Sequence, residues 1–189
     1  MKHKGTKYLE TSRLILRPFT KEDAPAMYQN WASDEEVTKY LMWPVHKDIS
    51  VSESILDEWI PNYQTPSYYQ WAIVPKDNNN KPIGCIGVNN SIDDTLKTAH
   101  IGYCIGRNWW HQGITSEALK SVITYLFTEV GLNRIESRHD PKNPNSGAVM
   151  RKCGMQYEGT LRQSDFNNQG ICDASYYSIL FEDFCTSQA

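Results

Sequence analysis

A turn with a single glycine, Gly113, stands between a short apolar segment and a helical pattern, and its residues could bind an anion. The segment 99–105 is apolar and rich in β-forming residues, which predicts a buried strand. From Thr115 to Val130 apolar residues recur every three or four positions, which predicts a helix ended by Gly131. The amides of residues 113–116 would then point the same way, with the positive end of the helix dipole behind them. The spacing predicts a phosphate site.

The same turn has a second interpretation, because one glycine between a strand and a helix is common in connections that bind nothing. The sequence lacks the three spaced glycines of a dinucleotide-binding fingerprint and the Gly-Lys-Ser/Thr ending of a P-loop. An FMN-binding or nucleotide-binding domain is therefore disfavoured. The turn alone leaves phosphate binding and a plain connection both open.

The strand and the turn together resemble the acetyl-CoA motif of the GNAT superfamily of N-acetyltransferases, in its RimJ/RimL-like branch. That branch has a strand ending Ile-Gly-Tyr and then Trp-x-x-Gly-x-Ala-Thr-Glu-Ala; this chain has Ile101-Gly102-Tyr103 and then Trp110-His111-Gln112-Gly113-Ile114-Thr115-Ser116-Glu117-Ala118. Thr115 stands where Ala or Gly is usual, and Trp110 replaces a Gln or Arg common in the wider family. The resemblance extends from Thr11 to about Phe184. It implies acetyl-CoA as co-substrate, bound through Tyr103, Cys104, Ile105, Gln112, Gly113, Ile114, Thr115 and Ser116.

A second block of the resemblance begins at Asn143-Pro144-Asn145-Ser146. With the residues that follow, it resembles the Asn-x-x-Ser…Glu-Lys-x-Gly-Phe block of the branch, with Arg151 and Met155 as departures. The resemblance implies that Asn143 contacts the pantetheine arm of CoA and that Ser146 lies near the CoA sulfur. A hydroxyl there can protonate the leaving thiolate. Ser146 is equally natural as the N-cap of a short helix, and both roles can hold together.

Acyl transfer to an amine needs an unprotonated amine, a stabilised oxyanion and a proton for the thiolate. Amines have pKa values of about 8 for an α-amino group and above about 10 for lysine, so a base or a relay of waters is useful. Histone-acetylating members of the family use a glutamate on the central strand, where this chain has His100. His100 is either that base or a strand histidine without a role. The family's oxyanion donor is a backbone amide near Cys104 or Ile105, and Cys104 itself suits a small core residue better than a nucleophile.

Aromatic residues outside these motifs are candidates for an acceptor pocket. The loop 42–46 contains Trp43 and His46 and shows no regular period, so it is either an ordinary loop held by its rings or part of an acceptor site. The family binds its acceptor between the loop joining its first two helices and the C-terminal hairpin. The resemblance thus implies a pocket lined by Trp43, His46, Trp71 and Tyr103. Aromatic walls attract a cationic amine and still bury its neutral form.

The elements that must position these residues follow from periodicity and from turn residues. We expect strands at 14–17, 69–74, 83–88, 99–105, 134–138, 155–161 and 174–181. We expect helices after an N-cap at Asp23, at 37–41, after an N-cap at Ser52, at 115–130 and at 146–153. This order predicts one α+β (mixed α/β) domain over residues 1–189. The resemblance implies the GNAT fold: a mixed, mostly antiparallel sheet of about seven strands, splayed between two parallel central strands and flanked by about four helices.

Composition limits the class of protein. The chain has 189 residues, 40% of them hydrophobic and 22% charged, which suits a domain with a continuous core. No apolar run approaches the ~20 residues of a membrane span, and the basic N-terminus leads into no apolar stretch, so we expect a cytoplasmic protein. Five cysteines without paired metal-ligand spacing predict reduced thiols and no metal. The net charge of −3 argues against a protein that wraps nucleic acid.

The resemblance implies an acetyl-CoA-dependent N-acetyltransferase that moves an acetyl group directly to a primary amine, on a protein N-terminus or on a small amine. Its partners are then acetyl-CoA and that acceptor, without nucleic acid or membrane, and we expect a monomer or homodimer. A non-catalytic module that senses acyl-CoA is the alternative. Ser146 favours the enzyme, because a sensor has no use for an acid at the sulfur.

Overall fold

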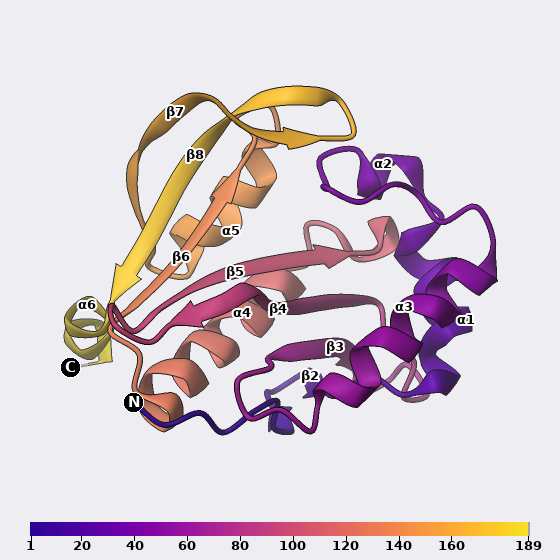
Figure 1. The fold of residues 1–189 in the computed structure, drawn as a ribbon, viewed down its shortest axis with the longest axis horizontal. Coiled ribbons are helices and arrows are strands. Elements are labelled where there is room, and N and C mark those ends of the chain that lie inside the picture. The colour runs from indigo at the N-terminus through magenta and orange to yellow at the C-terminus, as the bar shows by residue number, and fades with distance from the viewer. Residues whose placement is uncertain (189) are drawn as a thin grey trace.

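One open sheet organises the chain in the computed structural model, which describes residues 1–188 and the side chains of all of these except residues 90, 91, 187 and 188. Ala189, the last residue of the expected domain, lies outside the described residues. The described sheet has eight strands in the order β1 (Leu9–Glu10), β2 (Leu14–Arg17), β3 (Gln70–Pro75), β4 (Gly84–Asp93), β5 (Thr98–Ile105), β6 (Arg134–His139), β8 (Gly170–Leu180) and β7 (Gln156–Asn167) (Figure 1). The sheet has one strand more than expected, because the two residues of β1 pair with β2.

The two central strands are parallel and separate after three residues. β5 pairs with β6 only from Thr98 to His100, opposite Arg134–Glu136, whereas all other neighbouring strands are antiparallel. Beyond this point β5 stays paired with β4 and β6 stays paired with β8, so the sheet opens between them (Figure 1). The expected splay of a mostly antiparallel sheet is therefore confirmed, and it begins at His100.

Helices cover both faces of this sheet (Figure 1). They are α1 (Ala24–Met27), α2 (Glu35–Thr38), α3 (Ile49–Asn62), α4 (Ile114–Tyr125), α5 (Pro144–Lys152) and α6 (Phe181–Gln188). Short 3-10 or π-helical turns adjoin them at Lys21–Asp23, Tyr28–Ala32, Arg107–Trp109 and Leu126–Val130. The sequence did not predict α6, which follows directly after β8. None of the helices over residues 1–188 is long and apolar enough to span a membrane.

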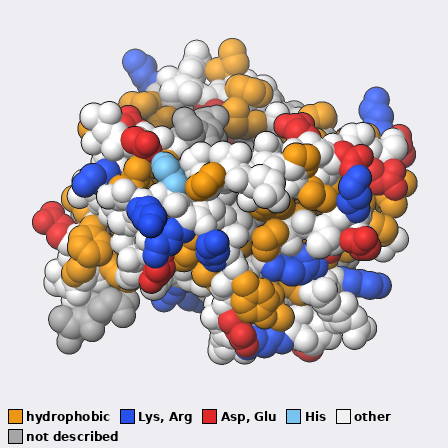
Figure 2. Space-filling model, turned by 60° about the horizontal axis from the view of Figure 1, so that its bottom comes forward, with side chains coloured by type: hydrophobic (Ala, Val, Ile, Leu, Met, Phe, Trp, Pro, Cys, Tyr) orange, Lys and Arg blue, Asp and Glu red, His pale blue; other side chains and the backbone are white. Residues whose placement is uncertain are grey.

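Alternation along the strands divides the buried residues into two cores. Trp71 and Ile73 of β3 enter a core shared with Leu119 of α4, whereas Ala72 and Val74 enter a core shared with the first three helices. Strand β3 is apolar at successive positions because both of its faces are covered. On the face shown in Figure 2, basic and acidic side chains lie interspersed among apolar ones.

Three helix starts differ in detail from the expectation, each for a local reason. Helix α1 begins at Ala24 with Asp23 in the expected N-cap position, but a 3-10 turn precedes it and the Asp23 carboxylate accepts the Thr20 amide at 2.8 Å instead of an amide of α1. Helix α3 begins at Ile49, where Asp48 accepts the Ser50 amide at 2.9 Å, so Ser52 is not its cap.

The third difference concerns Ser146. Helix α5 begins at Pro144, whose fixed φ suits a first helical turn, and Asn143 occupies the N-cap position. Ser146 therefore lies inside the helix, and its interpretation as an N-cap is wrong. This leaves its hydroxyl available for another partner.

Candidate active site

The glycine turn has the geometry that the sequence predicts. Gly113 has φ 74° and ψ 4°, a left-handed conformation that glycine adopts without strain, and it is the N-cap residue of α4. The Glu117 amide donates to the Gly113 carbonyl at 3.0 Å, which is the first bond of the helical pattern. The amides of Ile114, Thr115 and Ser116 precede that bond and have no acceptor within the helix. Such amides, at the positive end of α4, can bind an anion.

Two basic side chains lie close to this turn. A Cβ atom built on Gly113 would lie 3.6 Å from Lys152 Nζ and 3.7 Å from Arg13 Nη2. Glu117 fixes Arg13 in place, since Arg13 Nε donates to its Oε2 at 2.7 Å. Burial raises the pKa of Glu117, but hydrogen bonds from Thr11 and Arg13 outweigh it and lower the pKa below its usual value. Through their bonds to Glu117, Thr11 and Arg13 thus hold the Arg13 guanidinium beside the amides of residues 114–116.

Two cavities meet where β5 leaves β6. The first, which we name the turn cavity, has a volume of about 490 Å³ and is lined by residues of the glycine turn and of α5. The second, which we name the hairpin cavity, has a volume of about 440 Å³ and is lined by β5, β6 and the end of β7. The residues that line both cavities are Tyr40, Leu41, Tyr103, Cys104, Asn143 and Ser146. A reactant in one cavity can therefore meet a reactant in the other.

Tyr103 and Ser146 form the contact at this junction. The Tyr103 hydroxyl donates to the Ser146 carbonyl at 2.9 Å, and its oxygen lies 3.2 Å from Ser146 Oγ. Burial raises the pKa of the Tyr103 phenol, so it stays protonated at neutral pH. Because its hydrogen is directed to the carbonyl, the phenol oxygen can accept the Ser146 hydrogen. Ser146 is thus held as a neutral hydroxyl between the two cavities.

Beyond His100, some main-chain amides of β5 face the gap that opens between β5 and β6. Ser137 Oγ donates to the Ile101 carbonyl at 2.7 Å, so the backbone groups of Ile101 point toward β6. Because these groups alternate between the two edges of a strand, Tyr103 and Ile105 also point to the gap, whereas Cys104 points to β4. Of the two residues expected to supply the oxyanion donor, Ile105 therefore has its amide facing the gap, whereas the amide of Cys104 faces β4.

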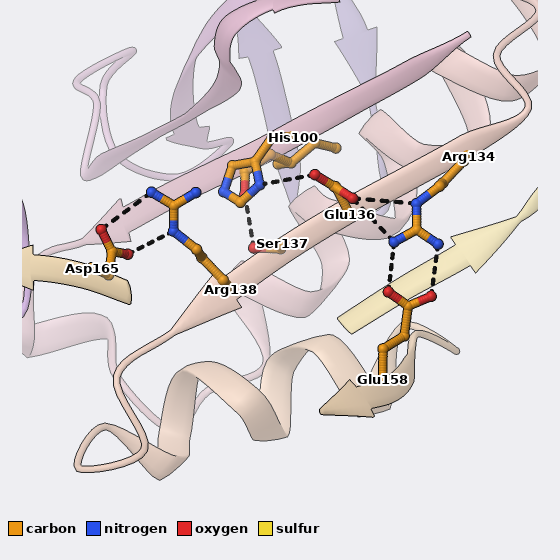
Figure 3. Close-up of polar contacts among 8 residues, drawn as sticks. His100, Arg134, Glu136, Ser137, Arg138, Glu158 and Asp165 are labelled. Atoms are coloured by element: carbon orange, nitrogen blue, oxygen red, sulfur yellow. Dashed lines mark hydrogen bonds and ion pairs between the residues drawn. The ribbon is translucent and has the colours of Figure 1, made fainter. Parts of the chain in front are cut away.

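His100 lines the hairpin cavity from the parallel part of β5. Its side chain is 15% exposed, and its Nδ1 lies 3.7 Å from Glu136 Oε1. Figure 3 shows its ring between Glu136 and Arg138. Burial lowers the pKa of His100, the Arg138 charge lowers it further, and Glu136 only partly offsets them, so the neutral base form dominates at neutral pH. His100 and Cys104 are four residues apart on one strand, roughly 13 Å along the backbone, so a water or the acceptor itself must span the hairpin cavity between His100 and the junction.

Three candidate residues do not lie where they were expected. Trp71 is fully buried, donates Nε1 to the Lys7 carbonyl at 2.7 Å and packs on Tyr125, so the prediction that it lines an acceptor pocket is wrong. Its place on the opposite face of the sheet follows from register, which the sequence does not show.

His46 and Gln112 are the other two. His46 is 8% exposed and bonds Ser52 Oγ at 2.8 Å, and burial lowers its pKa; it packs against Trp43 without lining the hairpin cavity. Gln112 is exposed and donates to the Asn108 carbonyl at 2.9 Å, so its side chain braces the loop outside the turn cavity. The prediction that His46 lines the acceptor pocket is wrong, because Ser52 holds its ring. The predicted cofactor contact of Gln112 stays a prediction for its main chain, because Asn108 holds its side chain.

The remaining candidates line the expected cavities. Trp43 and His100 line the hairpin cavity, and Gly113, Ile114, Thr115, Ser116 and Ile105 line the turn cavity. Cys104 is half-buried: it packs against the second core, as expected, and also lines both cavities.

Sequence reasoning missed the polar wall of the hairpin cavity. Arg138 and Asp165 form an ion pair across it, with 2.6 Å between Nε and Oδ2 (Figure 3). Asp140 is 8% exposed and accepts the Asn167 side-chain amide at 2.9 Å. Arg138 and Asp140 flank the C-terminal end of a central parallel strand, where ligands commonly bind, and this position was the signal that could have found them.

Hydrogen bonds from Asn168 join two segments beside the hairpin cavity, and we name this set of contacts the roof. Asn168, in the β7–β8 turn, donates its side-chain amide to the carbonyls of Thr38 and Trp43, each at 2.8 Å, and its backbone amide to the Leu41 carbonyl at 3.1 Å. These bonds join segments more than 120 residues apart, one on each side of the open sheet, as Figure 1 shows for the β7–β8 end and the segment after α2. The roof thus joins two segments that line the hairpin cavity, one at residues 40–43 and one at residues 165–167.

Comparison with known proteins places this geometry in a family. Residues 13–156 match the model described as "Acetyltransferase (GNAT) domain". The chain belongs to the GNAT family of acetyltransferases. It is 34% identical to an uncharacterized N-acetyltransferase, p20, of Bacillus licheniformis, over 93% of this chain and 97% of that one. It is 33% identical to the ribosomal-protein-serine acetyltransferase of Escherichia coli, over 53% of this chain and 55% of that one.

A solved structure of the same fold is the Microcin C7 self immunity acetyltransferase MccE, in complex with acetyl-CoA and AMP. Its TM-score is 0.79 at 25% identity, covering 90% of this chain and 93% of that chain. The expected fold and the expected enzyme class, an N-acetyltransferase with RimJ/RimL-like relatives, are therefore confirmed.

Proposed function

We propose that this GNAT acetyltransferase moves the acetyl group of acetyl-CoA directly to a primary amine, either a protein N-terminus or a small amine. The observation that carries the proposal is the meeting of two cavities at Tyr103 and Ser146, of which only one has an anion-binding turn. A module that merely senses acyl-CoA needs one cavity. The second cavity, with a neutral histidine and an aromatic side chain in its wall, favours an enzyme.

The turn cavity suits acetyl-CoA in its chemistry. The amides of residues 114–116, with Lys152 and Arg13 beside Gly113, provide donors and positive charge for a pyrophosphate. Asn143 lines the cavity between this turn and Ser146, where an amide side chain can bond the pantetheine arm. Under this proposal the thioester lies at the junction.

Three groups at or near the junction then carry out separate steps of the acetyl transfer. The amide of Ile105 faces the gap and stabilises the oxyanion that forms when the amine attacks the thioester carbonyl. Ser146 gives its proton to the leaving thiolate and regains it from the phenol side or from solvent. His100 takes the proton of the attacking amine through water, since it lies too far along β5 for direct contact.

The roof over the hairpin cavity bears on the acceptor. Asn168 holds the loop at 38–43 against the hairpin, so a lysine on a folded surface would bring a neighbouring backbone into collision with it. A small amine or an extended N-terminus enters without that collision. This ranks N-terminal and small amines above internal lysines.

A panel of amines assayed for thiol release from acetyl-CoA tests the proposal. It should contain small polyamines, amino acids, short peptides with free N-termini and peptides with a blocked N-terminus and one lysine. We expect thiol release with at least one acceptor of the first three kinds, and the acetylated product by mass spectrometry. Tight acetyl-CoA binding with no product from any acceptor would favour the sensing module. A cytoplasmic location remains a prediction.

A further inference from the structure

Two thiols face each other on the wall of the hairpin cavity. Cys85 of β4 and Cys104 of β5 are directly opposite in the antiparallel ladder, and their Sγ atoms are 3.4 Å apart. Both line the hairpin cavity, and Cys104 also lines the turn cavity. The pair is therefore open to small solutes and lies beside the junction of Tyr103 and Ser146.

The placement of this pair suits a disulfide. Opposite residues of an antiparallel pair have Cβ atoms about 4.5–5.5 Å apart, and a disulfide needs about 3.5–4.5 Å, so closing the bond requires a shift of roughly 1 Å. The hydrogen bond with the Cys104 thiol lowers the pKa of Cys85, and a bond from Gln70 adds to this against the effect of burial. The same thiol pairing raises the pKa of Cys104. Cys85 is thus the nucleophile and Cys104 the partner that keeps its proton.

We propose that Cys85 and Cys104 form a site of reversible oxidation by peroxides, and that the disulfide between them impairs acetyl transfer. The Cys85 thiolate attacks one oxygen of hydrogen peroxide, the O–O bond breaks, and a sulfenic acid and one water result after proton uptake. The Cys104 sulfur then attacks the Cys85 sulfur and displaces its hydroxyl, which leaves as the second water with the Cys104 proton. The thiols lose two electrons and two protons, and the peroxide is reduced to two waters. A dithiol reductant reverses the step by exchange.

The effect on transfer rests on the proposed function. Cys104 immediately precedes Ile105, whose amide faces the gap, so drawing Cys104 toward β4 displaces that amide. A misplacement of about 1 Å in a reacting geometry can cost about 100-fold in rate. We expect kcat to fall between about 10-fold and 100-fold on oxidation. Affinity for acetyl-CoA should change less than about 3-fold, since the turn at Gly113 lies outside the pair.

Peptide mapping after peroxide treatment tests the site. Trypsin does not cleave between Lys81 and Pro82, so Cys85 falls alone in peptide 77–97 and Cys104 falls alone in peptide 98–107. Digestion without reduction should yield these two peptides as one linked species that dithiothreitol separates. Cys104→Ser should abolish the linked species. Cys185→Ser is the matched control and should retain it, because Cys185 is exposed on α6.

The outcomes separate the site from the function. Recovery of the two peptides unlinked, or linked only to peptides with Cys153, Cys172 or Cys185, overturns the oxidation site. This measurement requires no activity, so it stands whether or not any amine is acetylated. A linked protein with unchanged kcat overturns the effect on transfer, whereas a fall in kcat that dithiothreitol restores, absent in Cys104→Ser, supports it.

Discussion

Gly113 has φ 74°, so a side chain at this position is both strained and placed at the mouth of the amide turn. An alanine Cβ would lie 3.6 Å from Lys152 Nζ and 3.7 Å from Arg13 Nη2, which are ordinary contact distances. Gly113→Ala therefore fits, and its cost is the left-handed backbone, about 1–2 kcal/mol. Gly113→Glu adds a carboxylate that can bond both cations and stand where a phosphate would bind.

We expect acetyl-CoA to bind Gly113→Ala within about 5-fold of wild type and Gly113→Glu at least about 100-fold more weakly. Two like charges about 4 Å apart repel by about 4 kcal/mol at an effective dielectric constant of about 20. A 100-fold loss corresponds to about 2.7 kcal/mol, which this repulsion supplies even after partial screening. Titration calorimetry with acetyl-CoA measures the three dissociation constants.

Gly170→Glu is the matched control for strain and charge. Gly170 has φ 102°, a Cβ there would have no atom within 4 Å, and it lines neither cavity. This variant should bind acetyl-CoA within about 2-fold of wild type, and thermal melts should show all variants folded. If acetyl-CoA binds wild type and Gly113→Glu alike, the phosphates bind elsewhere and the assignment of the turn is wrong.

Three further predictions concern the junction and the hairpin cavity. Ser146→Ala should lower kcat by about 10-fold to 10,000-fold with little change in acetyl-CoA affinity, measured by steady-state kinetics and calorimetry; an unchanged kcat would remove its role as proton donor. Trp43→Ala should raise the KM for the acceptor and leave the KM for acetyl-CoA near its original value, because Trp43 lines only the hairpin cavity; equal effects on both would contradict this. Because the pKa of His100 is lowered, the acid limb of kcat that belongs to His100 should lie below about pH 6.5, as the imidazole gains a proton, apart from the limb that protonation of the free acceptor amine imposes on kcat/KM at higher pH. His100→Gln should lose that acid limb, and a limb that persists belongs to another group.

Local sequence patterns predicted well the part of the site that is proposed to bind acetyl-CoA. The apolar period of α4, the β-forming run of β5 and the glycine between them are signals carried within about 30 residues, so they predicted the strand, the glycine turn and the free amides in the right order. The parallel pairing of β5 and β6 also followed from the strand-helix-strand pattern, whereas the splay was implied only by the family resemblance. Helix caps were predicted less well, because Asp48 and Ser52 are both competent caps and only the packing of His46 on Ser52 decides between them.

The sequence did not predict which residues line the hairpin cavity, because this depends on strand register and on contacts between distant segments. Whether Trp71 faces one core or the other depends on strand pairing, and a shift by one residue exchanges the two faces. The roof depends on Asn168 meeting Thr38 and Trp43 from the other end of the chain, and the thiol pair depends on β4 and β5 pairing Cys85 with Cys104.

The sequence by itself determined the glycine turn with its free amides, the order of all strands and helices but β1 and α6, and the residue types of the site, because each depends on interactions between near neighbours in the chain. Only the tertiary structure decided which side chains line the two cavities, that Ser146 bonds Tyr103, and that Arg138, Asp140 and the cysteine pair surround the reacting groups. These contacts form when distant segments pack, and the free energy that selects them is distributed over the whole core.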